Sequence, residues 1–258
     1  MLKVALVADP RREHQVAAMN AAGKGFAKHG HKPSIYTSLA GVGASDLVVT
    51  WGGRGDVNVP RLILEAGYLN GNSGEYVADR LRFISTSWNK PHGAGEFLGK
   101  VKRKRWKALG IEPADWRDKG GDYALILDQH PGDYNAPPRG VWESAIAAVD
   151  RMMPVRIRPH PLIAKSRPLE QDLAGAVLAV TWGSTAAVEA ILAGIPTYAL
   201  SEQAIVRPVA AHKLAEAPIT PNRYDWLCEL ACRQWRSEEL ASGEFLECIG
   251  WPEGLDIG

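Results

Sequence analysis

The sequence predicts an α/β protein made of two similar halves, each a parallel β-sheet covered by helices. Short apolar segments, each the length of one buried strand, alternate along the chain with stretches of helical spacing, as in sheets built from strand–helix–strand units. In addition, residues 48–54 (VVTWGGR) are matched by residues 179–185 (AVTWGST), and each copy lies at the end of a predicted strand. This repeat favours two Rossmann-like domains. Ligands of such sheets bind outside the carboxyl ends of the strands, so both copies indicate where a cleft should lie.

The composition is that of a folded protein with room for two modest domains. The chain has 258 residues, of which 46% are hydrophobic and 23% charged, and its formal net charge is +1. This charge gives no general argument for nucleic-acid binding. The three cysteines, Cys228, Cys232 and Cys248, form neither a disulfide framework nor a zinc-ligand pattern, so we expect them to pack and predict no metal site.

Nothing in the sequence indicates a membrane segment. No apolar run reaches the roughly 18 residues of a membrane span. The N-terminal stretch, MLKVALVADPRREH, holds too short an apolar run for a signal peptide. We therefore expect a cytoplasmic protein with no membrane partner.

In the first half, the predicted strands are short apolar runs bounded by Gly, Pro or charged residues. Helical spacing follows the first strand over His14 to Lys28, and a basic helix is expected over Gly99 to Gly110. The stretch from Asn70 to Gly95 is rich in Gly, Asn and Ser, as is typical of functional loops. The predicted strands are Lys3 to Ala8, Ser34 to Thr37, Asp46 to Trp51, Arg61 to Glu65 and Leu81 to Ser85.

The pattern restarts after a linker at residues 118–121. The second half is predicted to contain strands at Tyr123 to Leu127, Val155 to Arg158, Val177 to Thr181 and Pro196 to Leu200, and helices at Val141 to Met152, Gln171 to Ala174 and Thr185 to Ala193. Asn222 to Ser242 has the spacing of one long amphipathic helix, which we expect to cross back to the first domain. The predicted domains are therefore 1–119 and 120–221, with 222–258 packing on the first.

Several common catalytic motifs are missing. The first strand runs into Asp9-Pro-Arg-Arg-Glu13 without a G-x-G-x-x-G turn, and no Walker A loop, H-E-x-x-H or G-x-S-x-G occurs. These absences make four enzyme classes poorer candidates for this protein: dehydrogenase, P-loop kinase, zinc protease and α/β-hydrolase.

Two interpretations of the segment Gly183-Ser184-Thr185 remain open. A Ser or Thr at the start of a helix caps free N–H groups, which nearly every helix requires. The same N–H groups, beside small side chains, also bind phosphates. Glu189 favours the second interpretation, because a lone carboxylate on an otherwise apolar helix is rarely buried without a partner. It lies about one turn along the helix, where it can accept hydrogen bonds from sugar hydroxyls.

A second candidate is the hexapeptide RIRPHP at residues 156–161, which follows another predicted strand. A cation and an imidazole at a strand end suit a diphosphate, with Arg158 giving planar contacts and His160 nearby. The alternative is a surface turn fixed by prolines, with solvated basic residues. The hexapeptide alone does not decide between the two.

Taken together, these motifs resemble the donor half of GT-B glycosyltransferases of the capsule-polysaccharide and Kdo-transferase type. The resemblance covers about residues 122–200: RPHP, then a strand ending in a small-Ser-Thr triplet, then Glu-Ala and Gly-x-Pro. It implies that Ser184 and Thr185 bind the diphosphate of a nucleotide-sugar, that Glu189 binds the ribose, and that Arg158 and His160 lie near the phosphates. Relatives commonly carry Asn where this chain has Gly183, so here the triplet is expected to rely on backbone N–H groups.

A wider resemblance, to uncharacterised phage and prophage proteins described as glycosyltransferase-like, spans nearly the whole chain. It is carried by Glu65-Ala-Gly-Tyr68, Ser85-Thr-Ser-Trp-Asn89, Gln129-His-Pro-Gly-Asp133, RPHP, Arg223-Tyr-Asp-Trp226, Arg233-Gln-Trp235 and Glu239. It implies a viral enzyme acting in the infected host cell. A modified base in viral DNA is the acceptor that it suggests.

The first half is then expected to hold the acceptor and any catalytic base. Glu65 ends an apolar strand, where a general base would face the cleft, although pairing with Arg61, Arg80 or Arg82 is the alternative. Tyr68, Trp88 and Asn89 are candidates for contacting a sugar or base, although an aromatic residue in a loop is often simply packed. Asp9 and His14, just after the first strand, are lesser candidates.

The run Gly99-Lys-Val-Lys-Arg-Lys-Arg-Trp-Lys107 contains almost no acid. Such a run is usually a solvated helix face, but it also suits contacts with phosphates of double-stranded DNA. The residues that we assign to this role are Lys102, Arg103, Lys104 and Arg105.

The sequence therefore predicts a GT-B-like glycosyltransferase that uses a nucleotide-sugar, needs no cofactor, and releases a nucleoside diphosphate. The hypothetical acceptor is a hydroxymethylated base in DNA. Two alternatives stay open: a viral protein that binds nucleotide-sugar or nucleic acid without catalysis, and a sugar-nucleotide epimerase.

Overall fold

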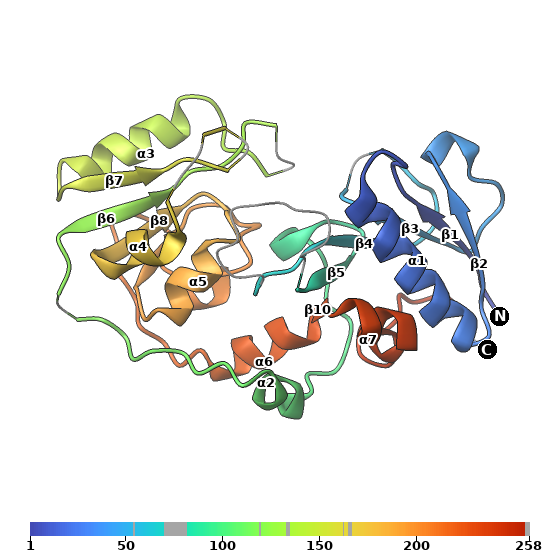
Figure 1. The fold of residues 1–258 in the computed structure, drawn as a ribbon. Helices are drawn as coiled ribbons and strands as arrows, with labels where there is room; N and C mark the ends of the chain where they lie inside the picture. The colour runs from blue at the N-terminus through green and yellow to red at the C-terminus, as the bar shows by residue number, and fades with distance from the viewer. Residues whose placement is uncertain are drawn as a thin grey trace. The chain divides into compact units, whose positions relative to one another are not determined.

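A computed structural model describes residues 1–53, 55–69, 82–118, 120–132, 135–161, 163–164 and 167–255. Within these ranges the chain divides into two compact units: residues 110–226 form the second, and the described residues of 1–69, 82–109 and 227–255 form the first (Figure 1). Six residues named from the sequence lie outside the described ranges: Arg54, Asn70, Arg80, Leu81, Lys119 and Asp133.

The described part of the first unit contains a six-stranded sheet in the order β10-β5-β4-β3-β1-β2. Its parallel strands are β1 (Lys3–Val7), β2 (Lys32–Tyr36), β3 (Leu47–Trp51) and β4 (Arg61–Ala66). The prediction of a fully parallel sheet is wrong at the other edge. There, β5 (Ile84–Trp88) runs antiparallel to β4, and β10 (Gln234–Trp235) runs antiparallel to β5. Antiparallel neighbours need no crossover helix, and the Gly-, Asn- and Ser-rich sequence before β5 has no helical spacing.

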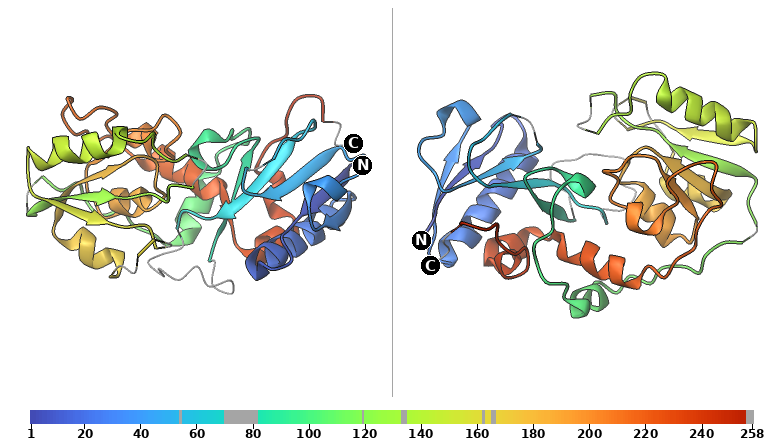
Figure 2. Two further views of the ribbon diagram at one scale, coloured as in Figure 1. Left: turned by 90° about the horizontal axis from the view of Figure 1, so that it is seen from above. Right: turned by 180° about the vertical axis from the view of Figure 1, so that it is seen from behind.

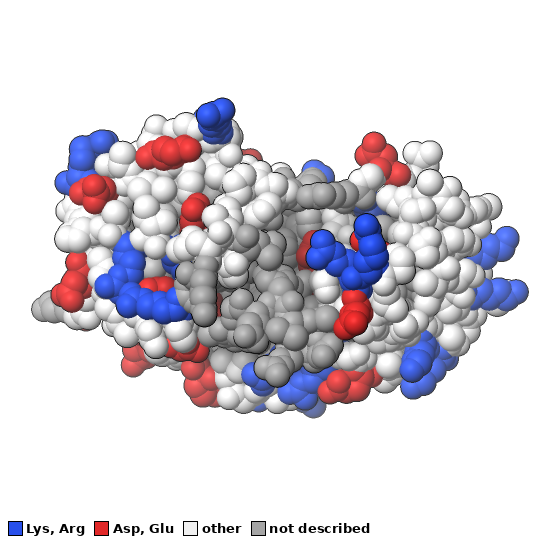
Figure 3. Space-filling model, turned by 45° about the horizontal axis from the view of Figure 1, so that its top comes forward, with Lys and Arg blue, Asp and Glu red and all other residues white. Residues whose placement is uncertain are grey.

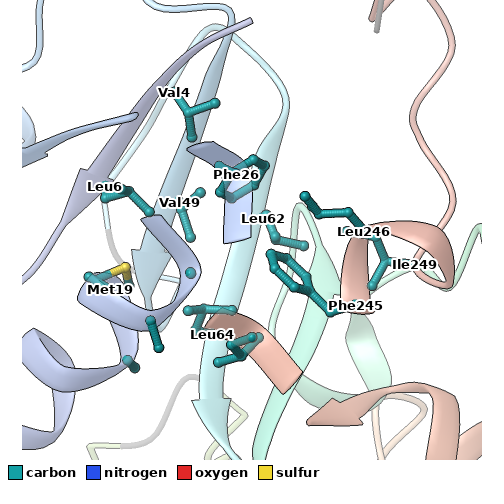
Figure 4. Packing of buried hydrophobic residues seen from close by; sticks show 14 of the residues in the cluster. Val4, Leu6, Met19, Phe26, Val49, Leu62, Leu64, Phe245, Leu246 and Ile249 are labelled. Carbon is teal, nitrogen blue, oxygen red and sulfur yellow. The ribbon is translucent and has the colours of Figure 1, made fainter. Parts of the chain in front are cut away.

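Helix α1 (Glu13–Lys28) packs against the C-terminal segment, which contains α7 (Ser237–Ser242) and the 3-10 helix η4 (Glu244–Glu247). The approach is close at Gly25, because a Cβ there would collide with the carbonyl oxygen of Leu240. Phe245, Leu246 and Ile249 complete the apolar core formed by α1, β1, β3 and β4 (Figure 4). The end of the chain is therefore an integral part of the first unit.

The prediction of a single long helix over Asn222 to Ser242 is wrong. Residues 224–242 form α6 (Tyr224–Cys232), the strand β10 and then α7. The break occurs because Gln234 and Trp235 are completely buried and pair with β5. Gln234 also accepts hydrogen bonds from the backbone N–H groups of Tyr68 and Leu69, at 2.9 and 3.1 Å. These distant contacts override the local helical spacing.

The described part of the second unit contains a four-stranded parallel sheet in the order β7-β6-β8-β9. Its strands are β6 (Tyr123–Leu127), β7 (Val155–Arg158), β8 (Ala176–Thr181) and β9 (Thr197–Ala199). Helix α3 (Val141–Asp150) covers one face, and α4 (Leu169–Ala174) and α5 (Ala187–Leu192) cover the other (Figures 1 and 2). The strand order changes direction between β6 and β8, which is where ligands of such sheets bind.

The remaining described helices are short. They are α2 (Arg103–Leu109), η1 (Leu39–Gly41), η2 (His92–Ala94) and η3 (Arg207–Val209). Among the described residues, no helix combines the length and apolar character that crossing a bilayer requires. On the face shown in Figure 3, acidic and basic side chains are interspersed among uncharged ones, in keeping with the net charge of +1. All three cysteines are buried and unpaired, as expected.

Candidate functional site

The segment that follows β8 lies beside the segment that follows β6. The N–H of Gly183 donates to Oε1 of Gln129 at 3.1 Å, and the N–H of Ser184 donates to Oγ1 of Thr181 at 2.8 Å. Gln129 comes two residues after β6, and Gly183 two residues after β8. The two strand ends are therefore joined at the point where the strand order changes direction, the expected place for a ligand.

The turn before α5 leaves one backbone donor available. Oγ of Ser184 accepts a long hydrogen bond, 3.4 Å, from the N–H of Ala186, which is the N-cap residue of α5, and among the described residues no side chain caps this helix. The N–H groups of Gly183 and Ser184 are occupied by internal acceptors. In the described part of the chain, no hydrogen bond uses the N–H of Thr185. Fewer backbone donors are thus available here than the sequence suggested.

Glu189 is half-buried on α5, and its carboxylate has no hydrogen bond or ion pair within the described ranges. Burial is the main reason that its pKa rises from 4.5 to about 7. The negative charge of Glu170 adds to this rise, and the positive charge of Arg158 opposes it. A desolvated carboxylate without a partner is costly, which is the condition expected of a group that meets a ligand.

Arg158 does not have the predicted role. Its guanidinium is buried, and it donates to Oδ2 of Asp172 at 2.6 Å and to the carbonyl oxygen of Arg167 at 2.7 Å. The guanidinium of Arg167 binds the other oxygen of Asp172. Arg158 therefore belongs to a buried ion-pair cluster that fastens α4 to β7. Its effect on the candidate site is electrostatic, through the pKa of Glu189.

His160 lies next to His130, which belongs to a motif of the wider resemblance but was given no role in the sequence interpretation. The rings of His130 and His160 meet edge to face, with centroids 5.7 Å apart, and they follow β6 and β7. Nδ1 of His130 accepts from the N–H of Gly132 at 3.0 Å. The neutral ring therefore carries its hydrogen on Nε2 and is a donor there. The sequence feature that could have identified this pair is the His-Pro dipeptide that follows each of the two strands.

Asn135 is a second residue that the sequence interpretation missed. Its Oδ1 lies 2.8 Å from Oγ of Ser201, and its Nδ2 occupies the space that a Cβ at Gly183 would need. No local pattern marks this residue, since it approaches Gly183 from a loop 48 positions earlier in the chain. Gln129 and Asn135 thus place two side-chain amides around Gly183.

In the first unit, Glu65 lies near the end of β4 beside Gly52, which follows β3. A Cβ at Gly52 would lie 3.1 Å from Oε1 of Glu65, so the carboxylate contacts the backbone of that turn. Glu65 is half-buried. After the end of β1, Asp9 is paired with Arg11. His14 packs edge-on against Trp51, the last residue of β3, with ring centroids 4.9 Å apart.

Two predicted acceptor contacts are core residues instead. Trp88 is 1% exposed, and its indole N–H donates to the carbonyl oxygen of Ile249. Tyr68 is 2% exposed, and burial raises its pKa to about 12. Trp88 ends β5 and Tyr68 comes two residues after β4, so both are held within the buried part of the sheet. Asn89 is exposed in a left-handed conformation with φ of 63°, immediately after β5.

The basic run divides into structural and exposed side chains. Arg105 makes two hydrogen bonds of 2.8 Å with Glu239, donates to two backbone carbonyls, and stacks on Trp235 at 3.9 Å. Its side chain is 8% exposed, which corrects its assignment as a DNA contact. Lys102 lies 3.8 Å from a carboxylate oxygen of Glu247 but is largely exposed, as are Arg103 and Lys104.

Comparisons with known proteins reveal the fold. No protein-family model and no curated protein sequence matches this chain. The structure is similar to a KpsC β-Kdo 2,7-transferase of Thermosulfurimonas dismutans, with a TM-score of 0.56 and 11% identity over 95% of this chain and 98% of that one. It is also similar to a KpsC β-Kdo 2,4-transferase of the same organism, with a TM-score of 0.55 and 12% identity over 91% and 92% of the two chains. The predicted GT-B-like, two-domain α/β fold is thereby confirmed.

Proposed function

We propose that this protein is a glycosyltransferase whose second unit binds a nucleotide-sugar at the carboxyl ends of β6 and β8. The observation that carries this proposal is Glu189: a half-buried carboxylate, without a partner among the described residues, one turn past the unused N–H of Thr185. A nucleotide supplies what such a site lacks, because its ribose hydroxyls donate to a carboxylate and its phosphate accepts from N–H groups. The similarity of the fold to two Kdo transferases supports the same function.

The donors near Thr185 suit the anionic leaving group of such a reaction. They are the N–H of Thr185, the amide of Gln129 beside Gly183, and the Nε2–H of His130, the next residue in the chain. Preorganised donors that meet charge as it develops on a leaving group lower the barrier to its departure. We infer that this set binds the phosphate and that Glu189 binds the ribose.

For the acceptor, we propose that the first unit supplies the general base, and that Glu65 is that base. Its carboxylate lies against the turn that follows β3, near the carboxyl end of the parallel strands. A carboxylate that takes the proton of an acceptor hydroxyl makes the oxygen a better nucleophile towards the sugar. Glu65→Gln should therefore retain nucleotide affinity and lose sugar transfer.

We further propose that the acceptor is a hydroxymethylated base in double-stranded DNA. The exposed basic side chains on and just before α2 support this acceptor over an uncharged one: Lys100, Lys102, Arg103, Lys104 and Lys107. They present positive charge on an otherwise near-neutral protein, which suits contacts with the phosphate backbone.

A thermal-shift screen with nucleoside mono- and diphosphates and their sugar conjugates tests the donor site. A ligand that binds only the native state raises Tm, and at a concentration of about 100 times its Kd it stabilises that state by about 2.7 kcal/mol. We expect at least one nucleotide to raise the Tm of the wild type and of Glu112→Ala, an exposed control in the same unit. Glu189→Ala should show no shift. An equal shift in Glu189→Ala, or no shift with any nucleotide in the wild type, would refute the proposal.

A further inference from the structure

The backbone at Gly183 does not itself require glycine. Its φ is not among the positive values found at other glycines of the described chain, so the backbone conformation there is one that an L-residue can adopt. What excludes a side chain is the Nδ2 group of Asn135, which occupies the position of the missing Cβ. Glycine at 183 and asparagine at 135 are therefore structurally linked.

The hydrogen bonds of Asn135 determine which way its amide faces. Oγ of Ser201 accepts from the N–H of Gln203 at 3.1 Å, so the serine hydrogen is free to be donated. Oδ1 of Asn135, 2.8 Å away, is the acceptor for that hydrogen. The NH2 group of Asn135 is thereby directed to Gly183 and has no acceptor among the described residues.

Gln129 is held in a matching way on the same glycine. Its Oε1 accepts the N–H of Gly183, which fixes the amide orientation and leaves Nε2 as a donor. The side chain is 8% exposed, and in the described part of the chain Nε2 has no acceptor. The Nε2 atom itself keeps some contact with solvent, so it is free to donate to a bound ligand. Two amides therefore present NH2 groups beside the segment that leads to Thr185.

We propose that Asn135 donates a hydrogen bond from Nδ2 to the phosphate of the bound nucleotide, from the space beside Gly183 that a Cβ would fill. This inference rests on the proposed nucleotide site. The space left by Gly183 admits the amide of Asn135, and Ser201 directs it. The donor side chain is thus supplied by the loop after β6 instead of the segment after β8.

The test is a relocation experiment, with affinity measured by isothermal titration of the nucleotide that gives the largest thermal shift. Asn135→Ala should weaken binding about tenfold, the loss expected for one hydrogen bond to a charged group. Adding Gly183→Asn to Asn135→Ala should restore affinity to within about threefold of the wild type, because the new side chain enters the vacated space. In the wild-type background, Gly183→Asn should instead weaken binding, since the two amides collide.

Two outcomes would overturn the inference: Asn135→Ala binding as tightly as the wild type, or the double variant binding no better than Asn135→Ala. The Tm of each variant without nucleotide controls for misfolding. Glu189→Ala in the same titration separates the two claims. If Glu189→Ala loses affinity and Asn135→Ala does not, only the role of Asn135 fails. If neither variant loses affinity, or the wild type binds no nucleotide, the nucleotide site fails as well.

Discussion

At position 189 an acidic side chain lies on a helix whose other residues are apolar. The carboxylate is desolvated and close to another negative charge, Glu170, while the nearby cation Arg158 is engaged with Asp172. The sequence showed that Glu189 is unusual, but not whether a partner exists in the core. That answer depends on Asp172, which lies 17 residues earlier and pairs with Arg158, the cation that acts on the pKa of Glu189.

The raised pKa of Glu189 makes stability depend on pH. In the unfolded chain the carboxyl ionises near its ordinary pKa of 4.5, whereas the folded protein retains the proton up to about pH 7. The folded state therefore binds more protons in this window, and stability falls as pH rises from about 4.5 to about 7. Glu189→Gln removes this effect. Thermal unfolding of the ligand-free protein should show little difference in Tm at low pH and a more stable variant at pH of about 8. A difference that is constant across the range would contradict the assignment.

Asp172 is predicted to be a stability residue. It neutralises a buried guanidinium, so Asp172→Ala leaves the charge of Arg158 uncompensated. We expect the free energy of unfolding to fall by about 3 kcal/mol, as is typical when one partner of a buried pair is removed. Urea denaturation measures this loss, with Asp118→Ala as an exposed control in the same unit. A change below about 1 kcal/mol would mean that the cluster does not hold α4 to β7.

Among the elements, the strands of the second unit are those that the sequence predicted best. β6 and β7 match their predicted ranges, and β8 differs by one residue at its start. β6 and β8 are short apolar runs and β7 alternates apolar with basic residues, so the local pattern suffices. α6, β10 and α7 were not separated, because Gln234 and Trp235 are extended only through pairing with β5 and burial under distant residues. The same holds within the site, where Glu189 was evident from local sequence and Asn135 was not.

Arg105 illustrates how one side chain holds several elements together. It joins α2 to the residues around α6, β10 and α7 through a bidentate pair with Glu239, bonds to the carbonyls of Ala231 and Gln234, and stacking on Trp235. Lysine keeps the charge but loses the planar geometry. We expect Arg105→Lys to lower the free energy of unfolding by about 2 kcal/mol, whereas Lys104→Gln on the same helix should be neutral. Urea denaturation compares them, and equal effects would contradict the structural role.

For the whole molecule, the repeated V-T-W-G sequence marks corresponding strand ends in two α/β units. Trp51 ends β3 and Thr181 ends β8, each beside the place where the strand order of its sheet reverses. The two-unit organisation was therefore accessible from the sequence. The antiparallel edge formed by β5 and β10 was not, since one of its strands comes from the far end of the chain.

A DNA acceptor predicts salt-dependent binding to duplex DNA. The lysines on and before α2 would each replace a counterion on the phosphate backbone, so log affinity should fall linearly with log salt by roughly 0.9 per contact. Replacing Lys100, Lys104 and Lys107 with Gln should reduce that slope. The same replacement of Lys24, Lys28 and Lys32, which are exposed elsewhere in the first unit, should not. Fluorescence anisotropy at several salt concentrations measures both slopes. Binding that is absent, or equally affected by both sets, would contradict a DNA acceptor at α2.

The central claim, sugar transfer from a nucleotide-sugar, is tested most directly by following the donor itself. Each nucleotide-sugar that binds is incubated with the protein, with and without DNA containing hydroxymethylated bases, and the nucleotide and sugar are quantified by mass spectrometry. We predict that free nucleotide is released and that the sugar is transferred to DNA or, by hydrolysis, to water. The rate of this reaction should be unchanged in Glu112→Ala and at least about 100-fold lower in Glu189→Ala. Bound donor that is recovered intact would indicate a non-catalytic protein. Donor converted to an isomer without nucleotide release would indicate an epimerase, and either result would contradict the claim.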